Sequence, residues 1–514
     1  MPDSSSATAA SFTSSGPIDS LSHPSFVGFI ATQFFGAFND NLFKQLLLLL
    51  AIPTAAVATM SENGSLDSAP DPATNQAVVA PVDSEPETDL TNVPSTNSST
   101  ESTTGDTAND TADSDTAKPS GGGDLQGIAT VVFGLPFVLF GGLAGYLADR
   151  YSKRTIIVTS KVAEIVVMGL GLLAFLATPM IGFAGLWIVL FLMGLQSTFF
   201  GPGKYGIMPE MLSGNQLNRG NGLVLMTTFI AIIIGTAVAG PLKDSIIPEG
   251  VPQLEAASGL WIGSLVCVGI AVVGTITSLL IIRLPAADPQ LKLKAEYLAV
   301  PKPMRTLLKT DTPLLIALLA SCVFWLIAGL TIQAVNSLGK TQLLVSDTKT
   351  SLMVSLISVG IAAGGAAAGV LSKRLTDRVV IQIGMWGVVA FCALMAISLP
   401  GGRHLLGFGG SIPVLMLLGA SAAFFAIPIQ VFLQARPPEA LKGRMIAVMN
   451  QANFFAIVMS GVLYQVLNTI LTNADLPRST VFGAMAVLFL PVAIFYRPSL
   501  ERTSVETLPV APID

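Results

Sequence analysis

Ionisable side chains lie inside stretches that are otherwise apolar, and they are the residues best suited to chemistry. Asp40 and Lys44 are four positions apart, so a helix places them on one face. Charges in such stretches are costly and tend to mark a substrate or proton pathway. The pair therefore binds a polar group or a proton, or it is an internal neutralising pair that only fixes packing. Three amide side chains accompany it, from Gln33, Asn39 and Asn41.

A second carboxylate lies in a later apolar stretch. Glu164 follows Lys161 by three positions. Lys161 can extend its ammonium group towards a membrane surface. Glu164 is then either a structural partner of Lys161 or Arg154, or a proton site, and both interpretations stay open.

Further polar candidates lie at a helix end and in a late apolar stretch. Arg219 is either an interfacial anchor or a group that points into a cavity. Asn450 and Asn453 form a polar patch together with Gln451. Amides at such positions join helices or contact a substrate, and the pattern favours neither.

Several kinds of chemistry lack the residues that they need. Neither His23 nor His404 has an aspartate five residues later, so the His-x4-Asp pair of certain acyltransferases is missing. The sequence has no phosphate-binding P-loop, which argues against an ATP-driven pump. The spacings of Cys267, Cys322 and Cys392 fit neither a metal site nor a disulfide framework. We therefore predict no enzymatic activity, no metal and no cofactor.

Composition indicates which elements must position these groups. Of the 514 residues, 51% are apolar and 11% are charged, and the mean hydropathy is +0.68. A soluble domain carries about 25% charged residues. The composition makes a soluble enzyme, a nucleic-acid binder or a disordered protein a poor match. It predicts a protein that crosses a membrane several times.

Twelve apolar stretches are long enough to cross a hydrocarbon core of about 30 Å as helices. They cover residues 26–52, 127–148, 155–177, 181–199, 222–241, 261–282, 314–335, 352–371, 379–399, 412–432, 445–470 and 480–496. We predict an all-α membrane protein with twelve transmembrane helices.

Lysine and arginine predict the orientation of these helices. With both termini in the cytoplasm, nineteen of the 27 Lys and Arg residues lie in cytoplasmic segments and six in outer loops. The cytoplasmic set includes Lys204 and Arg219, and the outer set includes Lys243 and Lys340. Cytoplasmic loops carry the excess of positive charge, so both termini are predicted to be cytoplasmic.

Polar segments at the termini and after the first stretch are predicted to stay disordered. Residues 1–25 and 497–514 form cytoplasmic tails. Residues 61–124 contain thirteen acidic residues against one lysine, Lys118, and form an acidic periplasmic insertion. Capture of a cation or of a partner is the alternative to plain solvation of this insertion.

A repeat divides the chain into two halves. Gly141 and Gly145 lead into a charged loop after the second stretch, and Gly365 and Gly369 do so after the eighth, at an offset of 224. Glycine at every fourth position lets helices pack closely. The predicted parts are a six-helix bundle at 26–283, a cytoplasmic linker at 284–312 and a second six-helix bundle at 313–496.

The two charged loops are candidate gates. Asp149 can bind a neighbouring helix terminus or an arginine in one conformation and release it in another. The alternative is that the loops are ordinary positive anchors. The candidate gating residues are Gly145, Asp149, Arg150, Lys153 and Arg154 in the first loop and Lys373, Arg374, Asp377 and Arg378 in the second.

The first loop carries a resemblance to a known family. Gly145-x-x-x-Asp149-Arg150-x-x-Lys153-Arg154 resembles the signature loop of the major facilitator superfamily, with Ser152 where that motif usually has glycine. Other stretches resemble one branch, the bacterial lysophospholipid transporters. These stretches include Phe38-Asn39-Asp40-Asn41, Lys204-Tyr205-Gly206-Ile207 and Gly443-Arg444-Met445-Ile446-Ala447-Val448-Met449-Asn450.

The resemblance implies a fold and a function. The superfamily implies two bundles that rock around a central site. The branch implies a transporter or flippase that moves lysophospholipids, or another amphipathic molecule, across the bacterial inner membrane. A separate acyltransferase that acts downstream is an implied partner. The alternatives are a proton-coupled exporter of drugs or metabolites and a membrane acyltransferase, the latter disfavoured by the missing histidine pair.

Overall fold

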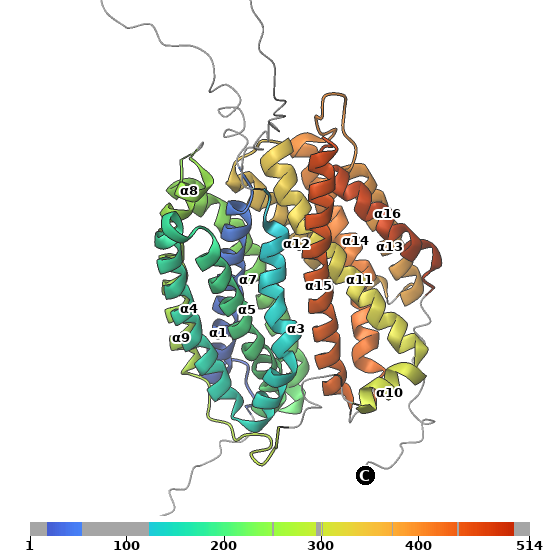
Figure 1. Cartoon of the computed structure of the whole chain (residues 1–514). Helices are drawn as coiled ribbons and strands as arrows, with labels where there is room; N and C mark the ends of the chain where they lie inside the picture. Colours follow the sequence, from blue (N-terminus) through green and yellow to red (C-terminus); the bar gives the residue numbers. More distant parts are fainter. Residues whose placement is uncertain are drawn as a thin grey trace, which may run out of the picture. The chain divides into compact units, whose positions relative to one another are not determined.

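A computed structural model describes residues 18–53, 123–248, 251–293, 300, 302–372, 374–438 and 441–497. All of its named elements are helices (Figure 1). The first half contains α1 (Pro24–Leu50), α3 (Gln126–Arg150), α4 (Lys153–Ile181), α5 (Ala184–Gly206), α6 (Met208–Met211), α7 (Gly214–Ile246), α8 (Gln253–Gly259) and α9 (Trp261–Ser278). The second half contains α11 (Thr312–Ser337), η2 (Leu338–Gln342), α12 (Asp347–Leu371), α13 (Asp377–Met395), α14 (Gly407–Ala435), α15 (Lys442–Asn473) and α16 (Thr480–Phe495).

Ten helical stretches among the described residues are long and apolar enough to span a membrane, with α8 and α9 forming one of them and η2 extending α11. Two further helices lie where the sequence predicts the remaining two spans. One is α1, which has 27 residues and carries Asp40 and Lys44. The other is the shorter apolar helix α16. The fold is that of an all-α membrane protein.

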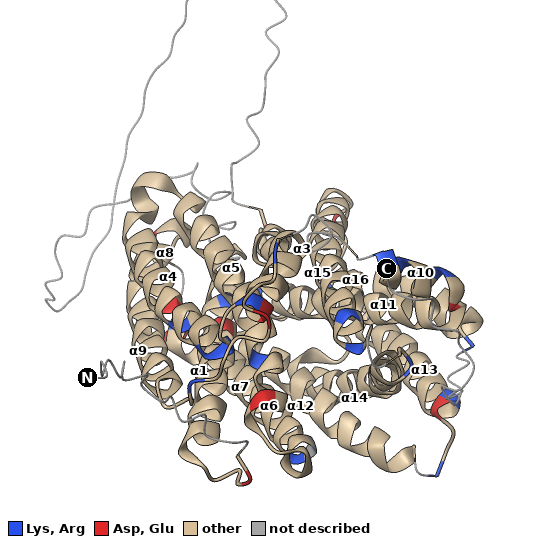
Figure 2. Ribbon diagram, turned by 90° about the horizontal axis from the view of Figure 1, so that it is seen from below, with Lys and Arg blue, Asp and Glu red and all other residues tan. Residues whose placement is uncertain are grey.

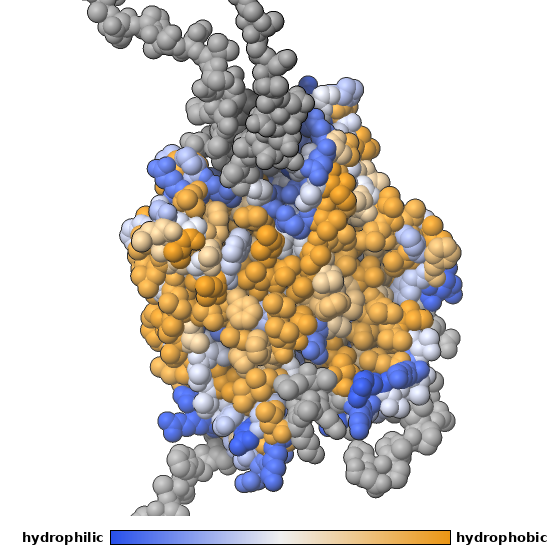
Figure 3. Space-filling view, in the orientation of Figure 1, coloured by the Kyte–Doolittle hydropathy of each residue, from blue (hydrophilic) through white to orange (hydrophobic). Residues whose placement is uncertain are grey.

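Large apolar side chains cover the outside of the described helices. Met180 is 89% exposed, Phe495 78% and Val487 71%. Figure 3 shows an apolar band over the helices, with hydrophilic residues gathered beyond it at both ends. Such a belt would be a liability in water, whereas hydrocarbon tails of a bilayer solvate it.

Each half has its own buried core. In the first half α1 packs against α7 and α9, and α4 packs against α5 and α9. In the second half α14 packs against α12 and α13, and α11 packs against α15. The halves meet mainly where α3 contacts α15 and where α7 contacts α12. Two pairs of helices therefore carry most of the contact between the bundles.

The predicted linker 284–312 contains a helix that the sequence analysis does not predict. This helix, α10 (Lys302–Thr310), leads directly into α11 and buries Met304. Asp311 caps α11, because its carboxylate accepts a hydrogen bond from the Leu314 amide at 3.1 Å. Arg436, at the end of α14, pairs with the same carboxylate at 2.6 Å. These contacts fix the end of the linker to the second half.

The predictions of disorder for residues 1–25 and 61–124 are wrong at the end of each segment that adjoins α1 or α3. Ile18 is buried and lies beside Leu212, where its amide donates a hydrogen bond to the Met211 carbonyl and its carbonyl accepts one from the Ser213 amide. His23 caps α1. Asp124 is buried at 5% exposure. Composition alone placed both residues with polar tracts, although long-range backbone and side-chain partners hold them. Residues 1–17, 54–122 and 498–514 lie outside the described residues.

Candidate functional site

A cavity of about 2290 Å³ lies between the two halves. Its lining comes from both halves and reaches Asp149, Lys302 and Arg444, near the ends of α3, α10 and α15. We call this side of the protein the open end; α10 lies on it in Figure 1. The opposite side, where Asp347 begins α12, does not contribute to the lining, and we call it the closed end.

Asp40 lines the middle of this cavity, where α1 faces α5. Its carboxylate accepts a hydrogen bond from the Ser197 hydroxyl at 2.6 Å and a longer one from the Gln196 amide at 3.4 Å. Within the described residues Asp40 has no ion pair, so the expected pairing with Lys44 is not formed. Hydroxyl and amide donors from a neighbouring helix stabilise the carboxylate instead.

Three described cavity lysines have no ion pair with a described carboxylate: Lys44, Lys204 and, near the start of α10, the exposed Lys302. The Lys44 ammonium lies over the ring of Phe133, 5.4 Å from its centre. Lys204 is 7% exposed and donates a hydrogen bond to the Thr228 hydroxyl at 3.1 Å. Because α5 continues to Gly206, Lys204 lies inside a helix and not in the loop to which the sequence analysis assigned it.

Gln33 continues the polar network from Lys204. The Thr228 hydroxyl donates to the Gln33 carbonyl oxygen at 2.7 Å, and the Gln33 amide donates to the Thr227 hydroxyl. These bonds join α1 to α7 at the cavity wall. Asn41 also lines the cavity, but its amide donates back to the Ala37 carbonyl at 2.7 Å.

Lys161, Glu164 and Asn39 form a buried cluster behind Asp40. Lys161 and Glu164 make an ion pair, and both are 1% exposed. The Asn39 amide donates to the other Glu164 oxygen at 2.7 Å. Glu164 therefore has two partners, of which Lys161 is the one that the sequence indicates. Arg154 contacts instead the Ile281 and Leu279 carbonyls.

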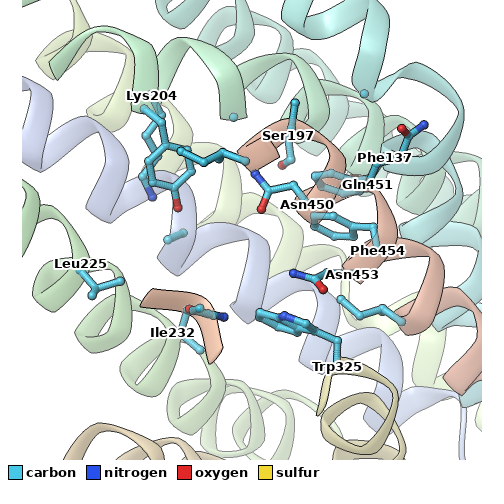
Figure 4. A pocket seen from close by; sticks show the side chains of 18 of the residues that line it. Phe137, Ser197, Lys204, Leu225, Ile232, Trp325, Asn450, Gln451, Asn453 and Phe454 are labelled. Carbon is cyan, nitrogen blue, oxygen red and sulfur yellow. The ribbon is translucent and has the colours of Figure 1, made fainter. Parts of the chain in front are cut away.

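The second half contributes amides and aromatic rings to the same cavity (Figure 4). Asn450 is exposed to it, whereas Asn453 is buried and accepts a hydrogen bond from the Ser321 hydroxyl at 2.9 Å. Gln451 donates across the interface to the Val138 carbonyl at 2.9 Å. Phe454 stacks on Phe137 of the first half with ring centres 3.7 Å apart. Two neighbouring residues of α15 thus join the halves while Asn450 remains available.

Arg219 does not reach this cavity. It lies in the first turns of α7, is exposed and is not part of the lining. This position fits an interfacial anchor, and the structure does not bring Arg219 together with Asp40. Among the described residues no group of three His, Cys, Asp or Glu side chains could hold a metal ion.

Three buried charges close the interface at the closed end. Asp347 of α12 lies between Lys243 of α7 and Lys340 of η2, whose ammonium groups are 2.6 and 2.8 Å from its two oxygens. All three side chains are 8% exposed. Next to them, the Asp244 carboxylate accepts hydrogen bonds from the first amides of α12, including Thr348 at 2.8 Å. A carboxylate from one half thereby caps a helix of the other.

Asp124 makes a second link at the closed end. Its carboxylate accepts a hydrogen bond from the Tyr464 hydroxyl of α15 at 2.6 Å and others from Gln126. Asp124 precedes α3 and lies outside the spans, and burial raises the pKa of its carboxyl group above the usual value. The Tyr464 and Gln126 hydrogen bonds act in the opposite direction, as does the charge of Arg478.

Glycines allow close backbone contact at this end. A methyl group on Gly240 would lie 2.2 Å from the Asp347 carbonyl oxygen, and one on Gly127 would lie 2.5 Å from that of Gly461. The reverse distance, from a methyl group on Gly461 to the Gly127 carbonyl, is also 2.5 Å. Both contacts join the halves, so side chains larger than glycine would force them apart.

The predicted gating residues of the first loop lie at the open end. Gly145 and Asp149 line the cavity, and nothing lies within 4 Å of a methyl group on Gly145. Arg150 donates to the Tyr146 hydroxyl at 2.5 Å and to the Leu291 carbonyl in the linker at 3.1 Å. Lys153 pairs with Glu210 of α6. Charged residues gather near α1, α6 and α7 in the view from below (Figure 2).

The second loop is more exposed. Arg374 and Arg378 are exposed, Asp377 is partly buried, and these three make no ion pair within the described part of the chain. Lys373 lies outside the described residues. The two loops repeat in sequence, and the first contacts the linker through Arg150 and Leu291.

Comparison with known proteins decides the family. The family model described as Major Facilitator Superfamily matches residues 117–461. The chain belongs to the Major Facilitator Superfamily. The match begins before α3 and ends within α15, so it covers helices of both halves.

Relatives within this superfamily share a common name. The lysophospholipid transporter LplT of Klebsiella pneumoniae (strain 342) is 27% identical over 348 residues, which cover 66% of this chain and 79% of that protein. The protein of the same name from Cronobacter sakazakii (strain ATCC BAA-894) is 28% identical over 349 residues, with the same two coverages of 66% and 79%.

Solved structures of the superfamily fold resemble this chain. A POT family transporter in complex with a thioalcohol-conjugated peptide aligns with a TM-score of 0.60 at 11% identity, over 91% of this chain and 94% of that one. The inward-open xylose transporter XylE from E. coli aligns with a TM-score of 0.53 at 13% identity, over 92% and 95%. At these identities the likeness shows the fold alone.

In this superfamily member the sequence analysis misses several cavity residues. Ser197 and Gln196 carry no charge and stand in an apolar helix, so nothing marks them as partners of Asp40. Lys204 follows Gly201, Pro202 and Gly203, a run that predicts a helix end. The helix continues through this run, and a lysine expected at the surface becomes a lining residue.

Proposed function

We propose that this chain moves lysophospholipids across the bacterial cytoplasmic membrane by alternating access between its two halves. The observation that carries the proposal is the uneven lining of the cavity: its charged groups at mid-depth belong to the first half, and they face apolar walls. The transporters named for lysophospholipids among the relatives support the substrate class.

The lining matches a molecule with one polar head and one acyl chain. Asp40, Lys44 and Lys204 offer charged contacts for a head group. Apolar side chains extend from this region along α7 and into the second half; they include Leu225, Phe229, Ile232, Trp325 and Ile361. A single acyl chain buries its methylenes against such a wall, at about 0.8 kcal/mol for each.

The direction of opening follows from charge. The open end carries Arg150, Lys153 and Arg154, and positively charged loops face the cytoplasm. In this orientation the cavity is open to the cytoplasm and closed to the periplasm, both termini are cytoplasmic, and Asp124 faces the periplasm. Rocking of the halves would close the open end and separate the contacts at Asp347.

Reconstitution tests the proposal directly. Proteoliposomes that contain the purified protein should move labelled lysophosphatidylethanolamine between leaflets faster than empty vesicles. Asp40→Asn should insert normally but transport at least about tenfold more slowly, because the neutral amide loses the charged contact. Arg219→Gln is the matched control, since it removes a charge outside the cavity. Rates equal to those of empty vesicles would exclude lysophospholipid transport.

A proton-coupled exporter of drugs or metabolites is the second candidate. It is favoured by Asp40 and Glu164, two carboxylates that both line the cavity. Dye efflux driven by a pH gradient, with no movement of lysophospholipid, would select it. We propose no chemical conversion by this chain; a separate acyltransferase would consume the delivered lysophospholipid by acylating its free hydroxyl.

A further inference from the structure

We infer that the exposed face of α10 binds anionic phospholipids at the surface of the membrane. These lipids stay beside the protein and are not the ones that the chain is proposed to move, so this surface is separate from the proposed function. Three features of α10 support it: a sequence with two faces, a place directly before a spanning helix, and basic side chains without counter-charges among the described residues.

The sequence of α10 divides into a basic side and an apolar side. The basic residues follow one another at intervals of three and four, so the helix places them on one side, and all are exposed. They are Lys302, Arg305 and Lys309. On the opposite side Met304 is buried, and Leu307 and Leu308 pack against the core of the second half. The apolar side therefore holds α10 on the protein and leaves the basic side available to another partner.

α10 lies at the depth where a membrane has its head groups. A single residue, Asp311, separates it from the spanning helix α11, on which Ile316 and Leu319 are already 44% and 55% exposed. From Asp311 to Ile316 a helix rises by about 7 Å, which matches a head-group layer of about 5–7 Å on each side of the hydrocarbon. Figure 1 shows α10 at the open end, running across the spanning helices and not along them. Its basic side chains therefore lie at similar depths.

The basic residues of α10 lack counter-charges in the described part of the chain. Lys302, Arg305 and Lys309 take part in none of the ion pairs there. α10 contains no acidic residue, and the neighbouring Asp311 already pairs with Arg436 and caps α11. Like charges on one face repel one another, and an anionic partner relieves this repulsion.

The first half treats its basic residues at the open end differently. Lys153 pairs with Glu210, and Arg154 donates to the Ile281 and Leu279 carbonyls. Those charges stabilise contacts within the protein. Orientation in a membrane requires only a sufficient number of positive charges on the cytoplasmic side. α10 goes further, because it presents three of them on one exposed surface.

An anionic phospholipid complements this surface. Phosphatidylglycerol carries one negative charge on its phosphate and no cation, whereas the charges of phosphatidylcholine cancel. Its acyl chains remain in the bilayer, where Ile316 and Leu319 of α11 are exposed to them. Each lysine or arginine near an anionic membrane surface strengthens binding about fivefold, so three together contribute on the order of a hundredfold.

The test measures which lipids bind the purified full chain in detergent. Binding of fluorescent phosphatidylglycerol is compared with that of phosphatidylcholine with the same acyl chains, at low and at high salt. The test variant combines Lys302→Gln, Arg305→Gln and Lys309→Gln. A second variant keeps every charge and combines Lys302→Arg, Arg305→Lys and Lys309→Arg. The matched control removes three exposed charges outside α10 and combines Arg219→Gln, Arg283→Gln and Lys292→Gln.

The native protein should bind phosphatidylglycerol at least about tenfold more tightly than phosphatidylcholine. The test variant should lose this preference, while the charge-keeping variant and the matched control should retain it. High salt should abolish the preference of the native protein, because at about 1 M salt charges are screened beyond about 3 Å.

Three results would overturn this lipid surface. An equal loss in the matched control would assign the preference to the net charge of the protein. A preference of the native protein that persists at high salt would exclude an electrostatic site, whether or not the test variant folds. Glycerophosphoglycerol is the head group without acyl chains; if it bound as tightly as the lipid, the ligand would be a soluble anion and not a membrane.

Discussion

The two ends of the interface between the halves are built differently. At the closed end, buried ions, a helix cap and backbone contacts at Gly240 and Gly127 join the halves. At the open end, nothing lies within 4 Å of a methyl group on Gly141 or Gly145, and Asp149 faces the cavity. Among the described residues, the buried ions and the close backbone contacts between the halves therefore lie at the closed end, while Gln451 and Phe454 join the halves at the cavity wall.

This difference indicates which contacts stabilise the present conformation relative to the opposite one. The open end keeps its charges solvated or joined to its own half and the linker, as Lys153 and Arg150 show. The closed end buries Asp347 with two lysines, one from each half. Substitutions that weaken the closed end should favour the opposite conformation, while those at lipid-facing positions should favour neither.

The ion cluster at Asp347 should give the largest effect. In Asp347→Asn, Lys243 and Lys340 stay buried without a counter-charge, and breaking a buried pair in this way costs about 3–5 kcal/mol. Separation of the halves hydrates both lysines, so the closed end should open. A cysteine at Ser337, which is buried against Tyr464, should then react rapidly with a membrane-impermeant maleimide.

A control on the same helix separates this effect from a general loss of charge. Lys349 is exposed on α12, so Lys349→Gln should leave the Ser337 cysteine protected. The three native cysteines are replaced in all variants. Continued protection of the cysteine in Asp347→Asn would mean that the ion cluster does not hold this end.

Backbone contact at Gly240 should give the next largest effect. The methyl group of Gly240→Ala would meet the backbone of Asp347 and Thr348, which cannot turn away as a side chain can. Overpacking of this kind costs about 1–3 kcal/mol. The variant should transport several-fold more slowly and expose the same cysteine, with Gly269→Ala as control, because nothing lies within 4 Å of that position. Equal rates for both variants would contradict a tight α7–α12 contact.

Much of this arrangement can be predicted from sequence, because hydrophobic length fixes the spans and a charge such as Asp40 stands out within one. The family model and the helices confirm the superfamily fold. The partners of Asp40 cannot be predicted, since Ser197 and Gln196 are uncharged and lie on another span. Packing between helices distant in sequence decides which donors meet it.

The closed end shows the same limit of sequence reasoning. Lys243 and Lys340 count as outer-loop charges in the sequence, and Asp347 lies in no recognisable motif. Only the approach of α7 to α12 brings them together. The repeated glycine and arginine motifs, by contrast, lie at the open end, where the present conformation leaves them largely without contacts across the interface.

Protonation of Asp124 should give the smallest effect and one that depends on pH. Burial raises the pKa of this carboxyl group while the closed end is shut, and solvent restores the ordinary pKa when it opens. Protons therefore bind more tightly to the closed conformation. Acid should stabilise it, and this stabilisation should be lost as pH rises from the ordinary carboxyl range through the raised pKa.

The reactivity of the Ser337 cysteine measures this shift between conformations. The rate is divided by that of a cysteine at exposed Lys349, because this ratio corrects for ionisation of the thiol. The normalised rate should rise with pH in the native background and stay flat in Asp124→Asn. Tyr464 and Arg478 also face the carboxyl group, and Asp124→Asn leaves both side chains in place. A pH dependence that survives in Asp124→Asn would assign the proton to another group and leave only the ion cluster and the glycine contacts to hold this end.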